Sequence, residues 1–421
     1  MKNPLKSFLS GFLVGMSTPI TTQIDHLFRN EYAKLISYLT SKFGVSHMDC
    51  IEDAVQDALL KAMQLWSYNE IPNEPGKWLY RVSYNKVIDS LRRQSKTLMF
   101  NPEIMTNYLE EDYELEQSIE DPQLQMIFAC CHPSISENDQ IMLSLNLLCG
   151  FSIPEMSRVL LKKPEAIKKG LSRAKKQFKT KVDHLAVPSK TELPERLNTV
   201  LKVIYLLFTN GYNAYKGNEL IKREVCEDAI RLAGLLHVNA HCSTPQLHAL
   251  IALMCFNLSR FEARISPKGD LVAMENQNRQ LWDRDLIQVG NKFILLANTT
   301  NGYSKFHLEA AIAREYALSS SYRTINWSAI LAIYDVLIGQ NQSATLTLNR
   351  LVVLSKVKGE QRALNELNLL DEKVHLTNHH YYSIKGDLEK KLQLPTYKIS
   401  LEKAISLTQN EKEKAFLTQK L

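Results

Sequence analysis

Apolar residues recur at helical spacing along most of the chain. Between Ile24 and Phe43, six of them share one face: Ile24, Leu27, Phe28, Leu35, Ile36 and Leu39. Residues three and four apart meet on the same side of an α-helix. The spacing recurs from Ile51 to Trp66 and, after a break at Ile71–Gly76, from about Lys77 to Gln94. Two prolines and a glycine make that break, because they cannot continue a helix. The pattern predicts an all-α fold.

A second helical unit is predicted after Pro122. It is interrupted at Cys149-Gly150 and then continues as two short helices separated by a polar step. Ser152 is a candidate N-cap with Glu155 as its capping-box partner, and Pro164 suits the first turn of the last helix. Two short helices joined in this way are typical of a helix-turn-helix.

Two features of the sequence indicate domain boundaries. The segment Asn101–Asp121 is rich in acidic residues and contains no Lys or Arg. We interpret it as a linker, which is either a solvated surface segment or a functional one. Val187 and Pro188 mark a second boundary. We expect a first helical domain at 20–97, the linker at 98–121, the helix-turn-helix domain at 122–186 and a helical extension at 187–421. Trp327, Leu331 and Tyr334 share one face in that extension, which suggests repeats of a tetratricopeptide-like kind.

The first residues need a separate interpretation. Lys2 and Lys6 precede a short apolar run that Gly11 interrupts, and Met16 is a second candidate start. We interpret residues 1–19 as a misassigned start or a disordered leader rather than a targeting signal. No apolar run approaches the roughly 20 residues of a membrane span. Seven cysteines without a CxxC pair argue against a disulfide framework or a structural zinc site, so we expect a cytoplasmic protein.

Composition alone says little about function. The 421 residues are 45% hydrophobic and 23% charged, with a net charge of +6, which is ordinary for a soluble globular protein. The position of the charge is more informative, because ten basic residues and one acid, Glu165, lie within Arg158–Lys181. A helix-turn-helix inserts the start of its second helix into the major groove, and surrounding cations neutralise phosphates. A basic run alone is usually a solvated helix face, but its place after a capped helix and a short turn favours DNA binding.

A second basic cluster contains aromatic residues. Lys77, Arg81, Lys86, Arg92, Arg93 and Lys96 alternate with Trp78, Tyr80 and Tyr84. Bases of single-stranded DNA stack on aromatic rings while cations follow the backbone. The alternative is that Trp78 and Tyr80 are core residues, and for Trp78 taken alone that alternative is the stronger one.

The order of these segments resembles a known family. EDAVQDALLKAMQLW (Glu52–Trp66) and WLYRVSYNKVIDSLRR (Trp78–Arg93) resemble region 2 of extracytoplasmic-function RNA polymerase sigma factors, a group of the sigma-70 superfamily. The stretch SIPEMSRVLLKKPEAIKKGLSRAKKQF resembles their region 4. A subgroup with a large fused C-terminal domain is similar over the rest of the chain, in IFACCHPSIS, ELPERL, FTNGY, EDAIRLAGLL and NRQLWDRDLI.

The resemblance implies a set of functional residues. Core RNA polymerase would be bound by Asp53, Gln56 and Asp57. The minus-ten element, with one base flipped into the loop Asn69–Gly76, would be bound by Asn69, Asn73, Trp78, Arg81, Asn85, Lys86, Asp89, Arg92 and Arg93. The minus-thirty-five element would be read by Glu165, Ala166, Lys168, Lys169, Ser172, Arg173, Lys175 and Lys176. The acidic linker would pass through the polymerase cleft, where its charge could mimic RNA.

The sequence departs from the family pattern at two positions. Tyr84 stands where a basic residue is usual, so a phosphate contact there is in doubt. Gly170 lies inside the reading helix, where a long polar residue is usual and where glycine costs about 1 kcal/mol relative to alanine. We assign no base contact to Gly170.

Three functional hypotheses follow from the sequence. The first is a sigma factor that directs polymerase to promoters, is controlled by its extension, catalyses nothing and needs no cofactor. The second is a plain helix-turn-helix regulator that binds duplex DNA without polymerase. The third is an enzyme in the extension, but P-loop, HExxH and GxSxG motifs are missing. We interpret Cys130-Cys131-His132 as structural, and His379-His380 as surface residues rather than ligands. A protein or peptide partner of the extension is also expected.

Overall fold

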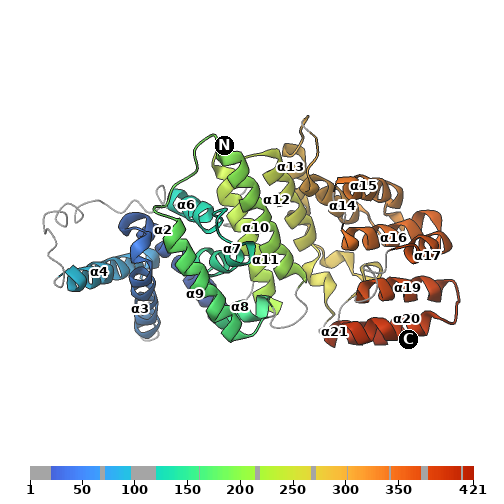
Figure 1. The fold of residues 1–421 in the computed structure, drawn as a ribbon, viewed down its shortest axis with the longest axis horizontal. Helices are drawn as coiled ribbons and strands as arrows, with labels where there is room; N and C mark the ends of the chain where they lie inside the picture. The colour runs from blue at the N-terminus through green and yellow to red at the C-terminus, as the bar shows by residue number, and fades with distance from the viewer. Residues whose placement is uncertain are drawn as a thin grey trace. The chain divides into compact units, whose positions relative to one another are not determined.

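The computed structural model describes residues 20–66, 72–95, 120–160, 162–213, 219–266, 272–300, 302–340, 343–370, 378–408 and 411–421. All regular elements within these ranges are helices (Figure 1), which confirms the predicted all-α fold class. The chain divides into two compact units, one formed by Met1–Gly211 with Glu227–Cys242, the other by Tyr212–Cys226 with Ser243–Leu421. The predicted leader 1–19, Asn69 and most of the predicted linker 98–121 lie outside the described residues.

The first unit opens with three helices and continues with the predicted helix-turn-helix. Its elements are α2 (Ile20–Phe43), η1 (Val45–His47), α3 (Met48–Trp66), α4 (Pro75–Ser95), α6 (Glu120–Cys130), α7 (Glu137–Leu143), the π-helical turn η4 (Ser144–Leu148), α8 (Ile153–Leu160) and α9 (Pro164–Lys181).

Helix α2 is the centre of this unit. It packs against α3 and α4, and also against α6 and η4. Leu35, Ile36 and Leu39 are buried on it, and so are the polar residues Ser37 and Thr40. A helix covered on several sides must bury polar positions as well as its apolar face. The helices that carry the two basic segments, α4 and α9, belong to the same compact unit as α2.

The break predicted at Cys149-Gly150 has a tertiary reason. Gly150 has φ +67°, a conformation that residues with a Cβ rarely adopt. A Cβ placed there would lie 2.9 Å from the backbone oxygen of Arg29 on α2. The Arg29 guanidinium also lies over the Phe151 ring, 4.9 Å from its centroid. The chain can thus turn between η4 and α8 only by passing directly against α2.

The predicted helix starts agree with the structure. The Glu155 carboxylate accepts hydrogen bonds from the Ser152 backbone N–H at 2.8 Å and from its hydroxyl at 2.6 Å, just before α8 begins at Ile153. Pro164 is the first residue of α9, where its missing N–H costs nothing.

Two further helices follow, α10 (Leu193–Asn213) and α11 (Glu219–Val238). Most of each belongs to the first unit, while the end of α10 and the start of α11, within Tyr212–Cys226, belong to the second. Arg196 on α10 donates through Nη2 to the Phe128 carbonyl at 2.7 Å. Arg231 on α11 donates through Nη2 to the Leu148 carbonyl at 2.6 Å. These two arginines satisfy carbonyl groups at the ends of α6 and η4, so residues beyond 187 help to hold these two elements.

The second unit continues with short helices. They are α12 (Pro245–Leu258), η5 (Phe261–Arg264), η6 (Met274–Asn276), η7 (Arg279–Leu281), α13 (Arg284–Leu296), α14 (Lys305–Leu318), η8 (Tyr322–Thr324), α15 (Trp327–Gln340), α16 (Ala344–Lys358), α17 (Glu360–Asn368), α19 (His379–Lys391), α20 (Tyr397–Leu407) and α21 (Glu411–Thr418).

Neighbours in sequence pack against each other from α12 to α21 (Figure 1). Leu331 and Tyr334 are buried in an apolar cluster formed mainly by residues of α14 to α19, and the partly buried Trp327 packs against it, as their common face predicts. A Cβ at Gly386 on α19 would lie 2.8 Å from the Leu401 side chain, so the missing side chain lets α20 approach closely. Within the described part of the chain, no helix is both long enough and apolar enough to span a membrane.

Candidate nucleic-acid interface

Helix α9 separates its apolar and basic residues cleanly. Its inner face is formed by Ile167, Gly170, Leu171, Ala174 and Phe178, all buried. Its outer face carries most of the predicted minus-thirty-five residues, which are exposed: Glu165, Ala166, Lys168, Lys169, Ser172, Arg173 and Lys176. The first turns of α9 therefore present a continuous polar and basic surface.

Gly170 lies on the inner face of α9. A Cβ there would lie 2.9 Å from both Sδ and Cε of Met142 on α7. The absence of a side chain allows α7 and α9 to pack closely, and the position does not reach the basic surface. The departure from the family pattern thus has a packing reason.

Arg173 is held by an acid that sequence reasoning did not single out. Its Nη2 lies 2.7 Å from Oδ1 of Asp139, and its Nε lies 3.3 Å from Oδ2. The Asp139 side chain is only 2% exposed, whereas the Arg173 side chain is 62% exposed. A guanidinium oriented by a buried carboxylate keeps its remaining N–H groups directed outward. The Asp139 backbone N–H donates to Ser136 Oγ at 3.3 Å, which caps the start of α7 and holds Asp139 in place.

The end of α9 meets α3 rather than solvent. Lys175 Nζ lies 2.7 Å from Glu52 Oε2, and Lys179 Nζ lies 2.6 Å from Asp49 Oδ2. Burial raises the pKa of Glu52, while the charge of Lys175 acts in the opposite direction. Lys175, predicted to contact DNA, is therefore engaged inside the unit. Neither acid was recognised from the sequence, since each lies on a helix distant from Lys175 along the chain.

Helix α4 carries the second basic cluster on its exposed side. The predicted minus-ten residues that are exposed on or just before it are Asn73, Arg81, Asn85, Lys86, Asp89, Arg92 and Arg93. Lys86 forms an ion pair with Asp57 of α3. The structure thereby brings together one residue predicted to bind DNA and one predicted to bind polymerase.

Aromatic residues join α2, α3 and α4. The Trp78 ring is partly buried and lies 5.5 Å from the Trp66 ring, which stacks on Phe28 at 5.8 Å. Tyr80 lies 5.2 Å from Tyr38 in an edge-to-face contact. Trp78 and Tyr80 are therefore part of the packing between helices, in line with the core alternative raised by the sequence.

Tyr84 is a core residue. Its side chain is 8% exposed, and its ring lies 5.4 Å from Phe43 with the Lys42 ammonium 5.1 Å from its centroid. A buried position between α2 and α4 suits an aromatic ring, which explains why a basic residue is absent here.

The outer face of α3 carries Asp53, Gln56 and Asp57, all exposed. Leu60 continues the same face, and 57% of its surface is exposed. Sequence reasoning missed Leu60, although its place three residues after Asp57 in an otherwise polar stripe was a usable signal. Leu60 therefore adds an exposed apolar side chain to a face that is otherwise acidic and polar.

Both thiols of Cys130-Cys131-His132 lie in the core. Cys130, Cys131 and Cys149 are buried, and burial raises the pKa of Cys131 to about 12. A thiol with so high a pKa stays protonated near neutral pH and is a poor nucleophile. Burial and the charges of Arg196 and Lys181 lower the pKa of His132. These observations agree with a structural role for Cys130-Cys131-His132.

Comparison with known proteins agrees with this geometry. Residues 27–97 match sigma-70 region 2, and residues 196–298 match a family of unknown function, DUF6596. An uncharacterized protein of Rhizobium meliloti (strain 1021) is 30% identical over 383 residues, covering 89% of this chain and 90% of the relative. No solved structure matches the chain. The chain therefore belongs to the sigma-70 family of RNA polymerase sigma factors, which act in transcription initiation with core polymerase and promoter DNA, and it carries a large fused C-terminal domain.

Proposed function

We propose that the chain is a sigma factor of the extracytoplasmic-function group that directs polymerase to specific promoters. The observation that carries this proposal is the exposed basic surface of α9 in the same compact unit as the region 2 helices. In this proposal α9 reads the minus-thirty-five element of duplex DNA. Lys168 and Lys169 neutralise phosphates, while Glu165, Ala166, Ser172 and Arg173 face the base edges.

Region 2 would bind the minus-ten element and the polymerase with different helices. On α4, Arg92 and Arg93 would follow the backbone of the melted strand, with Asn85 and Asp89 beside them. On α3, the exposed face formed by Asp53, Gln56 and Leu60 would dock on core polymerase. Because Lys86 and Asp57 form an ion pair between these helices, docking and DNA binding would be mechanically linked.

The packing of α9 on α3 has a consequence for promoter binding. Lys175 and Lys179 are paired with Glu52 and Asp49, so in this arrangement their charges are already compensated by carboxylates. Contacts from the end of α9 to DNA would require these pairs to separate. The proposal therefore assigns the first turns of α9 to initial recognition and Lys175 to a later contact.

Regulation in cis by the extension is part of the proposal. Arg196 and Arg231 follow the helix-turn-helix in sequence and bind carbonyl groups of α6 and η4. Helical hairpins such as α15–α16 and α19–α20 suit a tetratricopeptide-like surface that binds a protein or peptide. A partner of the extension could thus act on the DNA-binding unit through α10 and α11. The proposal includes no catalytic step.

The test of the sigma function uses the purified full chain and core polymerase. We expect a stable holoenzyme and transcription from promoters defined by sequencing transcripts after overproduction. Binding to duplex DNA without any association with polymerase would favour the plain regulator instead.

The test of regulation uses Arg231→Met, which leaves the Leu148 carbonyl without its donor. We expect a changed affinity for the minus-thirty-five element and unchanged binding to core polymerase. Arg284→Met, on the exposed start of α13, is the control. Equal transcription by both variants would remove this route of control from the proposal.

A further inference from the structure

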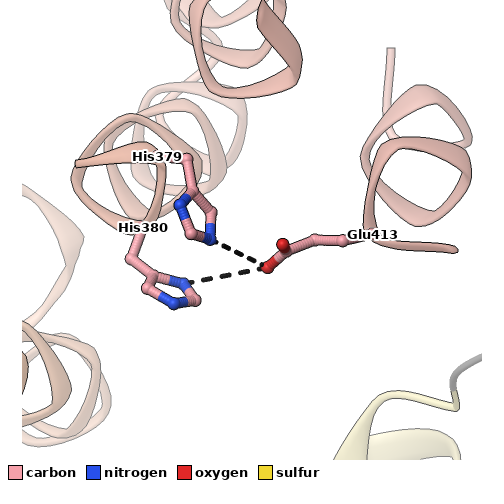
Figure 2. Close-up of side chains that lie close together, drawn as sticks. All are labelled: His379, His380 and Glu413. Atoms are coloured by element: carbon pink, nitrogen blue, oxygen red, sulfur yellow. Dashed lines mark hydrogen bonds and ion pairs between the residues drawn. The ribbon is translucent and has the colours of Figure 1, made fainter. Parts of the chain in front are cut away.

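The last helix of the chain returns to the start of α19. His379 and His380 open α19, and Glu413 lies on α21, 34 residues after His379. Figure 2 shows both imidazole rings directed toward the same carboxylate. Across the described residues, these three form one group in which a ligand atom from each lies within 4.8 Å of the others.

The distances suit a metal ion. His379 Nε2 lies 3.1 Å from Glu413 Oε1, and His380 Nδ1 lies 4.0 Å from the same oxygen. Ligand bonds of about 2.0–2.2 Å in a tetrahedral zinc site place neighbouring ligand atoms about 3.4 Å apart. The distances of 3.1 and 4.0 Å lie on either side of that value. Small side-chain movements would therefore suffice to place one ion between the three groups.

The surroundings fix the Glu413 side chain and the backbone of His380. The Thr408 hydroxyl donates to Glu413 Oε2 at 2.6 Å, which leaves Oε1 directed at the histidines. The His380 backbone N–H donates to Asn378 Oδ1 at 3.0 Å, so the first turn of α19 is capped and its backbone is held. A hydrogen bond to the second oxygen of a ligating carboxylate is the usual support of a metal site. The His380 side chain is 58% exposed, which gives an ion access from solvent.

A bound ion would strengthen the attachment of helix α21 to the rest of the chain. Helix α21 has eight residues, and a helix this short is marginal alone. Its apolar attachment rests on a small cluster of Leu401, Ala404 and Leu417, and Lys420 adds an ion pair with Asp387 at 2.7 Å. A shared ion would add a stronger connection between α21 and α19.

We propose that His379, His380 and Glu413 bind one divalent ion of the zinc class and thereby fasten α21 to the start of α19. Imidazole nitrogens with one carboxylate oxygen are ligands that Zn²⁺ accepts. The His-His pair, interpreted from the sequence as surface, gains a ligand role only because Glu413 returns to it. This proposal is independent of the sigma function.

The experiment titrates the full chain with Zn²⁺ by calorimetry, after removal of metals with a chelator and in the presence of a thiol-free reductant. We expect one ion per chain. Glu413→Gln and His380→Ala should each weaken binding at least about tenfold, and Thr408→Val about tenfold as the loss of a supporting bond. His241→Ala, at an exposed histidine, is the matched control and should leave binding unchanged.

A second measurement keeps the proposal falsifiable if a variant loses α21. In the parent chain, Zn²⁺ should slow proteolysis within residues 411–421 severalfold. Absence of both binding and protection in the parent chain would overturn the proposal. Equal Zn²⁺ affinity of the parent chain, Glu413→Gln and His380→Ala would assign the ion to other groups and overturn it as well.

Discussion

Lys175 Nζ lies 2.7 Å from Glu52 Oε2, and both side chains are largely shielded from solvent, at 18% and 11% exposed. The pair joins α9 to α3 across 123 residues of sequence. It connects the helix proposed to read DNA with the helix proposed to bind polymerase.

Lys175→Met should destabilise the chain by about 2 kcal/mol, because it leaves a shielded carboxylate without its cation. The value is set below that of a fully buried pair, since both side chains retain some contact with water. Urea unfolding of the full chain measures the change. Lys176→Met, at the exposed neighbour, should stay within about 0.5 kcal/mol. Similar losses in the two variants would show that the pair adds nothing to stability.

The Glu52 carboxyl should give stability a specific dependence on pH. Burial raises its pKa in the folded chain above the ordinary value of 4.5. The folded state therefore holds this proton more tightly than the unfolded state, so the contribution of Glu52 is fully present below pH 4.5 and is lost as pH rises through the raised pKa. Glu52→Gln remains neutral and should gain stability relative to the parent chain from about pH 4 to pH 7. Urea unfolding at several pH values checks this, and a pH-independent difference would be the contrary result.

The two basic clusters should have separable roles in DNA binding. The double variant Lys168→Ala with Lys169→Ala should weaken binding to the minus-thirty-five element. It should also reduce the slope of log affinity against log salt concentration by about 2, one for each phosphate contact that is lost. The double variant Arg92→Ala with Arg93→Ala should instead reduce melting of the DNA duplex at the minus-ten element. Holoenzyme binding to intact and pre-melted promoter templates distinguishes them. The same defect of both pairs on the pre-melted template would contradict this division.

Docking on polymerase should depend on the exposed face of α3. Asp53→Lys and Leu60→Ser should each weaken holoenzyme formation, because the first reverses a charge and the second removes an apolar contact at the same face. Asp57 is a poorer probe, since its reversal would also disturb Lys86. Association with core polymerase is measured by fluorescence titration. Glu195→Lys, exposed on α10, is the control for charge reversal; an equal effect of Asp53→Lys and Glu195→Lys, with none from Leu60→Ser, would indicate general electrostatics.

Gly150→Ala should destabilise the first unit by about 1–3 kcal/mol, since it combines strain at φ +67° with an approach of 2.9 Å to the Arg29 carbonyl. Gly339→Ala is a useful contrast, because nothing lies within 4 Å of a Cβ there and alanine favours α15. Thermal unfolding followed by circular dichroism should show a lower midpoint for the first variant and an equal or higher midpoint for the second. A neutral Gly150→Ala would mean that α2 and the η4–α8 turn separate easily.

The sequence by itself determined the helices and their order. Apolar spacing from Ile24 to Phe43 and from Ile51 to Trp66 coincides with α2 and α3, and the break at Cys149-Gly150 and the starts at Ser152 and Pro164 agree with the structure. The break predicted at Ile71–Gly76 ends earlier than expected, because α4 already begins at Pro75 and proline is tolerated in a first helical turn. These signals are local, since a few neighbouring residues set the backbone conformation. The motifs of region 2 were also readable, because they are continuous along α3 and α4.

Only the tertiary structure decided which residues meet. Glu52 reaches Lys175, Asp139 orients Arg173, and Glu413 returns to His379, each from another helix. It also decided that Gly170 and Tyr84 face the core, which the family pattern left open. The physical reason is that a helical period fixes the face on which a residue lies but not the helix that covers that face. Packing of distant segments makes that choice.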